Sequence, residues 1–145
     1  MIQNRVSSLV VIAPAIKEFY LLQKCVENMI PESEVLVLQP DKQEIKQITL
    51  RIQKYIQIKD IHIISQGYPG YLYLGNSSLS INNFNYYSPY LKKWSVSNIY
   101  LYGCNVGSQN IGKRFILRLY KTTGAKIYTL DSPNGTNTKV GVGIW

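Results

Sequence analysis

Short runs of apolar, mostly β-branched residues alternate with segments of helical periodicity along this chain, and that alternation restricts the fold more than any other feature. Apolar runs of about four to eight residues are typical of buried strands, and apolar residues at i, i+3 and i+4 are typical of amphipathic helices. The predicted strands are residues 8–13, 35–38, 60–65, 97–102 and 126–130. The predicted helices are residues 16–30, 41–55, 81–94 and 111–120. We expect the second helix to begin with Asp41 as N-cap and Glu44 in a capping box.

The order of these elements predicts an α/β domain, because strands that are joined through helices run parallel in one sheet and carry the helices on its faces. After the third strand the period shortens to two at residues 71–74 and 79–81, which indicates a small hairpin. Residues 140–145 are predicted to form a last edge strand. We therefore predict a three-layer αβα sandwich with a mostly parallel central sheet, as a single domain over residues 1–145.

The composition excludes several classes of protein. The chain has 145 residues, of which 46% are hydrophobic, enough for one domain with a buried core. It lacks both an apolar run of about 18 residues and a signal-peptide pattern, so we expect a soluble and, by default, cytoplasmic protein. Two cysteines, Cys25 and Cys104, are too few for a disulfide framework. Because the sequence has no metal-ligand cluster, phosphate loop or dinucleotide fingerprint, no metal or cofactor is expected.

The net charge of +8 is concentrated in the second half of the chain. The first 60 residues carry eight basic and seven acidic side chains, whereas the remainder carries eight basic side chains and one acid. Arg114, Arg118 and Lys121 recur at helical spacing and form a predicted basic stripe. Such a stripe is either a solvated helix face or a contact for an acidic partner. No nucleic-acid-binding motif accompanies it, so nucleic acid is not the expected partner.

Two glycine-containing turns follow predicted strands. Residues 63–70 read Ile-Ile-Ser-Gln-Gly-Tyr-Pro-Gly, and residues 101–106 read Leu-Tyr-Gly-Cys-Asn-Val. Together with the strands Leu9–Val11 and Val35–Leu38 and the helix end Thr123–Ala125, this pattern resembles a caspase-like domain of unassigned function that is found near the N-terminus of large bacterial surface or secreted proteins. The resemblance covers nearly the whole chain. It implies the fold of caspases, gingipains and separases, in which a His after one strand and a Cys after the next form a peptidase dyad.

Carried over residue by residue, the resemblance places Cys104 at the nucleophile position and Gln66 at the base position. A cysteine peptidase needs an imidazole that takes the proton of the thiol and later protonates the leaving amine. Glutamine can neither take nor give a proton. The resemblance also implies a pair of backbone donors, Gly67 and Cys104, that would stabilise an oxyanion or hold a carboxylate. Asp131, which follows the fifth predicted strand, either lines the same pocket or is the first residue of a turn.

His62 is the one histidine of the chain, and it cannot replace the missing base. It lies four residues before Gln66 on the same predicted strand, which at about 3.3 Å per residue separates the two Cα atoms by about 13 Å. We predict that His62 is a buried and hydrogen-bonded residue of the sheet. Cys104 is either a small apolar residue that fills a tight turn or the remaining nucleophile of the site.

These observations predict a caspase-like domain that is inactive as a peptidase and acts as a binding or regulatory module for a protein or peptide partner. The alternative belongs to a different functional class. It is an active or self-processing cysteine peptidase that uses Cys104 with another group in place of the imidazole. Turnover of peptides, or the appearance of a new chain terminus, distinguishes the two.

Overall fold

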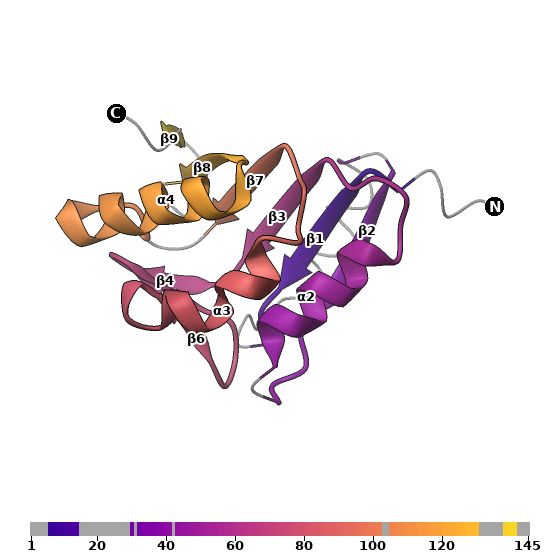
Figure 1. Cartoon of the computed structure of the whole chain (residues 1–145), viewed down its shortest axis with the longest axis horizontal. Coiled ribbons are helices and arrows are strands. Elements are labelled where there is room, and N and C mark those ends of the chain that lie inside the picture. The colour runs from indigo at the N-terminus through magenta and orange to yellow at the C-terminus, as the bar shows by residue number, and fades with distance from the viewer. Residues whose placement is uncertain are drawn as a thin grey trace.

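The computed structural model describes residues 6–14, 30, 32–41, 43–102, 105–130 and 138–141. Within these residues, six strands form one central sheet (Figure 1). Their order across the sheet is β2-β1-β3-β7-β8-β9. The first five are parallel to their neighbours, and only β9 pairs antiparallel, with β8. The bounds are β1 Ser8–Ile12, β2 Ser33–Val37, β3 Asp60–Ile64, β7 Asn98–Tyr102, β8 Lys126–Leu130 and β9 Thr138–Gly141.

The helices α2 (Glu44–Gln53), α3 (Phe84–Leu91) and α4 (Gln109–Thr123) lie on the same side of the sheet (Figure 1). The α/β class and the mostly parallel sheet are therefore confirmed. The helix predicted over residues 16–30 falls outside the described ranges except for Ile30, and the second helical layer of the predicted sandwich depends on it.

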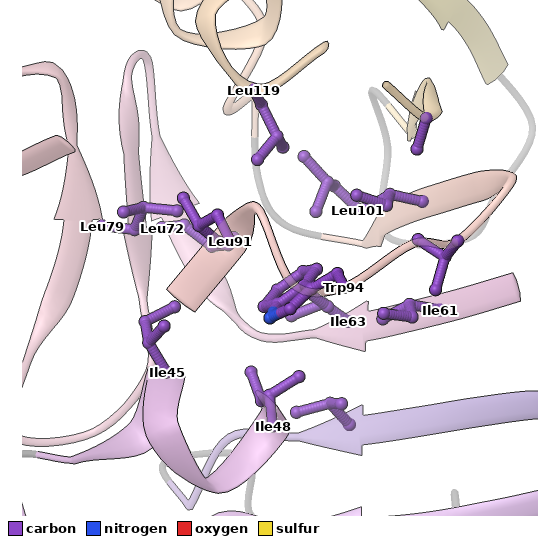
Figure 2. Close-up of a cluster of buried hydrophobic side chains, with 14 of the residues drawn as sticks. Ile45, Ile48, Ile61, Ile63, Leu72, Leu79, Leu91, Trp94, Leu101 and Leu119 are labelled. Carbon is purple, nitrogen blue, oxygen red and sulfur yellow. The ribbon is translucent and has the colours of Figure 1, made fainter. Parts of the chain in front are cut away.

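The hydrophobic core forms between this face of the sheet and the three helices. Alternate residues of each parallel strand point into it, among them Ile61 and Ile63 of β3. Figure 2 shows these two side chains with Ile48 of α2 and with Trp94, which follows α3. The indole Nε1–H of Trp94 donates a buried hydrogen bond of 2.9 Å to Thr49 Oγ1 of α2. The helices bury one stripe each and β1 is buried along its whole length, which explains why helical periodicity and continuous apolar runs predicted these elements.

The start of α2 differs from the prediction. The helix begins at Glu44, so Glu44 lies in the first turn and does not close a capping box with Asp41. The Asp41 carboxylate accepts hydrogen bonds from Gln43 N at 3.0 Å and from Gln47 Nε2 at 2.8 Å. Glu44 is free of the helix cap because its side chain turns toward the second, smaller sheet.

That smaller sheet has three antiparallel strands within the described residues, in the order β4-β5-β6. It lies beyond the carboxyl ends of β1 and β3 (Figure 1). β5 (Tyr71–Tyr73) and β6 (Ser78–Ser80) are the predicted hairpin. β4 (Gln66–Tyr68) was expected to be part of a loop, but it pairs with β5 because the turn at Pro69 and Gly70 reverses the chain.

Two further elements differ in their bounds from the sequence prediction. The helix expected at residues 81–94 begins as a 3-10 turn at Ile81–Asn83 and continues as α3, which carries Pro89 inside it. The last described strand, β9, begins at Thr138, earlier than the predicted residues 140–145, of which residues 142–145 lie outside the described chain. It does lie at the edge of the sheet, as expected for an edge strand.

Candidate functional site

The chain leaves β3 and β7 at the same edge of the central sheet. These strands are parallel neighbours, with Ile64 opposite Tyr102, and the backbone N–H of Ser65 continues the ladder with a hydrogen bond of 3.4 Å to the carbonyl of Tyr102. Ligands of open α/β sheets bind at the carboxyl ends of the strands. The loops after these two strands therefore begin side by side, as far as Tyr102.

The turn after β4 is attached to the segment that leads into α4. The backbone N–H of Gly70 donates a hydrogen bond of 2.9 Å to the carbonyl of Val106. Gly70 has a φ of +78°, and a Cβ there would lie 2.7 Å from a side-chain carbon of Ile111 in α4. Only glycine fits this left-handed position and close approach without strain. The turn after β4 and the segment before α4 are thus in direct contact at the candidate site.

The predicted site residues are only partly within the described chain. Gln66, at the predicted base position, is the first residue of β4 and its side chain is exposed. Gly67 lies opposite Leu72, and a Cβ at residue 67 would lie 2.6 Å from the Tyr71 carbonyl oxygen, which explains the glycine. Cys104 and Asp131 lie outside the described residues. Their roles, and that of Gly67 as a backbone donor, stay predictions.

His62 is buried, as predicted, and only 9% of its surface is exposed. Its Nδ1 and the Tyr102 hydroxyl oxygen are 2.8 Å apart and share a hydrogen bond. The imidazole also stacks on the Tyr100 ring, with centroids 4.6 Å apart and planes 7° apart, and Tyr100 in turn contacts Tyr128 at 4.7 Å. His62 is therefore one member of a row of aromatic side chains across β3, β7 and β8, at a distance from the sheet edge.

We expect the free energy of unfolding to decrease as the pH falls below about 7, because His62 binds a proton less readily in the folded than in the unfolded state. Burial lowers the pKa of His62 below its ordinary value of 6.5, against a smaller opposing effect of Asp60. The unfolded chain therefore binds the proton first, so the stabilisation is complete above pH 6.5 and is lost as the pH falls toward the pKa of the folded state.

Urea-induced unfolding at several pH values measures this effect. In the variant His62→Gln, which keeps a polar group beside Tyr102 but cannot titrate, the dependence on pH in this window should become smaller. An equal dependence in both proteins would contradict the assignment to His62, since the chain contains no other histidine.

The predicted basic stripe lies on α4, but one of its members has structural contacts. Arg118 is half-buried, its guanidinium lies 5.1 Å from the centre of the Phe84 ring, and its Nη2 donates a hydrogen bond to Asn85 Oδ1. Arg114 and Lys121 are exposed. Binding of an acidic partner here stays a prediction, and a test of it should change only the two exposed residues.

The sequence analysis missed a cluster of tyrosines beside Gln66. The cluster comes from β4 and β5. The ring of Tyr68 contacts that of Tyr71 at a centroid distance of 4.9 Å and that of Tyr73 at 5.6 Å. Alternation of tyrosines at residues 71 and 73 was the available signal, but it was used only to predict the hairpin. Nearby, Ser65 Oγ is buried and has no hydrogen-bond partner among the described residues.

Two features that are absent from the described residues limit their chemistry. Among them no group of three or more His, Cys, Asp or Glu side chains is placed to hold a metal ion. In the same part of the chain, none of the helices has the length and apolar character needed to cross a membrane.

The fold and this edge define an α/β domain with a small antiparallel sheet attached after β3. The chain belongs to the family described as "Domain of unknown function (DUF4347)", which matches residues 9–145. The comparisons with curated proteins and with solved structures found no match. Family membership agrees with the expected domain of unassigned function. The caspase-like fold is named by none of these comparisons and stays a prediction from the motifs.

Proposed function

We propose that this domain is a caspase-like binding or regulatory module that recognises a protein or peptide partner and has lost peptidase chemistry. The observation that carries the proposal is the exposed Gln66, the first residue of β4 and two residues after the end of β3, where the resemblance places the catalytic base. An amide side chain forms hydrogen bonds in both directions but does not transfer protons at neutral pH.

The position of the single histidine supports the same proposal. His62 is a buried residue of β3, and its Nδ1 shares a hydrogen bond with the Tyr102 hydroxyl. A general base must come within about 3 Å of the proton that it removes. His62 lies in the middle of β3 and does not reach the sheet edge, so it cannot act as the base there.

We expect no turnover of fluorogenic peptides with Lys, Arg or Asp at the cleavage position, and no change in mass of the purified protein on incubation. The variant Gln66→His restores an imidazole at the predicted base position and is expected to produce slow cleavage of peptides or of the chain itself. Any activity of this variant should disappear when Cys104→Ala is added.

The matched control is Gln53→His, which introduces the same group at an exposed position on the last residue of α2. It should remain inactive. The proposal fails if the unchanged protein cleaves peptides, or processes itself, in a manner that Cys104→Ala abolishes. That outcome would establish the alternative, an active cysteine peptidase.

A further inference from the structure

The small sheet has a face of tyrosines whose role the proposed function does not explain. This tyrosine face is formed by Gln66, Tyr68, Tyr71 and Tyr73. Cross-strand pairing puts Gln66 opposite Tyr73 and Tyr68 opposite Tyr71, so all four side chains project from the same side of the sheet. Leu72 projects from the other side and is buried in the core. Tyr68 and Tyr73 are 47% and 38% exposed, so the face is accessible.

The rings of this face are held in place before any partner arrives. The Tyr73 hydroxyl donates a hydrogen bond of 3.0 Å to the Tyr68 hydroxyl, and Asn82 Nδ2 donates one of 3.4 Å to the Tyr71 hydroxyl. Tyr68 stacks on Tyr71 with ring planes 28° apart. Ordered tyrosines provide a large contact area at a low cost in conformational entropy.

The residues that form this face are uncharged, and this restricts the chemistry of its partner. The segment 61–91, which contains all four of them, has no Asp, Glu, Lys or Arg, although the whole chain has a net charge of +8. A charged group of a partner that packed on the four side chains would lose water without meeting an opposite charge among them, which is unfavourable. Segments rich in Tyr, Ser, Gly and Asn are typical of protein-binding surfaces, and the centres of interfaces are depleted of charged residues.

The groups of the face match those of a polypeptide. The Tyr73 hydroxyl donates its one proton to the Tyr68 hydroxyl, and the rings present mainly carbon to a partner. The exposed amide of Gln66 offers one donor group and one acceptor, the same pair that a peptide group has.

We propose that the tyrosine face binds an uncharged, extended peptide segment of a partner protein. Proline or aliphatic side chains of the segment pack on the rings of Tyr68 and Tyr73, and a peptide group of the segment pairs with the amide of Gln66. Aromatic-lined surfaces recognise proline-rich and extended segments in this way. The inference rests on the proposed function, because it assumes that the domain binds a peptide and does not cleave it.

The test uses a displayed library of random twelve-residue peptides, selected on the whole chain. The enriched peptides should lack charged residues and contain proline, leucine or valine. Their affinity should decrease about tenfold or more in Tyr68→Ser and in Tyr73→Ser, as expected for aromatic residues at the centre of an interface. The affinity should be the same at low and physiological salt, since no ion pair forms.

The matched control is Tyr86→Ser, which removes a tyrosine of α3 that is 73% exposed and lies outside the tyrosine face. It should bind as the unchanged protein does. Gln66→Ala, at an exposed position, provides a second variant that does not remove a ring, and it should weaken binding severalfold. Circular dichroism and the midpoint of unfolding establish that each variant is folded.

The inference is wrong if selection yields no binder, if the enriched peptides are charged, or if they bind Tyr68→Ser and Tyr73→Ser as tightly as the unchanged protein. A carbohydrate on a glycan array that requires the same two tyrosines would also overturn it. None of these results would show that the protein cleaves peptides. The proposal that it has lost peptidase chemistry would therefore survive them. Cleavage of the selected peptides that depends on Cys104 would instead defeat the proposed function.

Discussion

Replacing Glu44 with alanine is expected to lower the free energy of unfolding by about 3 kcal/mol, because two hydrogen bonds to a buried charged group are lost. The Glu44 side chain is fully buried and its carboxylate accepts hydrogen bonds from Asn76 N at 2.8 Å and from Ser77 Oγ at 2.5 Å. Both donors belong to the turn between β5 and β6. Glu44→Ala would leave them unpaired and would weaken the attachment of this turn to the start of α2.

Urea-induced unfolding measures the loss, and the chain contains a suitable control. Glu34 forms an ion pair of 3.0 Å with Arg51, in which about a third of each side chain is exposed. Glu34→Ala should therefore cost less than about 1 kcal/mol. In the double variant Glu44→Ala with Ser77→Ala the two losses should not add, since the same hydrogen bond is counted in both. If Glu44→Ala is no more destabilising than Glu34→Ala, the Glu44 carboxylate does not hold the turn between β5 and β6 on α2.

Replacing Gly112 with alanine is expected to destabilise the domain by about 2 kcal/mol, although alanine is the better helix former. Gly112 lies within α4, and a Cβ at this residue would be 2.5 Å from the carbonyl carbon of Gly107 and 2.8 Å from the Val106 carbonyl oxygen. Both contacts are with backbone, which cannot rotate away as a side chain would. The segment at 105–107, which carries the hydrogen bond to Gly70, would have to move.

The comparison for this variant is Lys113→Ala, at the next residue of α4, which is exposed. It should change the free energy of unfolding by no more than about 0.5 kcal/mol. Helix propensity alone predicts that Gly112→Ala stabilises the protein by about 1 kcal/mol. A stabilised Gly112→Ala protein would therefore show that the backbone of residues 106 and 107 does not press on α4.

Part of the candidate site could be predicted from the sequence. The apolar run that ends before Gln66 predicted the end of β3, and the run that ends at Tyr102 predicted the end of its neighbour. The tyrosine face could not be predicted, because its membership depends on which residues of β4 and β5 stand opposite each other. A shift of one residue in that register would move every side chain to the other side of the sheet.

The amino-acid sequence by itself determined the elements and their class of arrangement. Buried β-branched runs that alternate with amphipathic helices have few stable arrangements other than a mostly parallel sheet, because each apolar face must be covered and each crossover is right-handed. These constraints are local, and they can be seen in a window of about ten residues.

Only the tertiary structure decided the partners of particular side chains. Glu44 has the sequence context of a helix cap, but it binds a turn about thirty residues later in the chain. Gly112 has the context of a weak helix residue, but it allows a loop to approach α4. Arg118 has the context of a solvent-exposed cation, but it packs on Phe84. The contacts of Glu44 and Arg118 join residues more than thirty positions apart, and the contact of Gly112 depends on how the preceding loop folds back on the helix. Periodicity and propensity carry no information about either kind of approach.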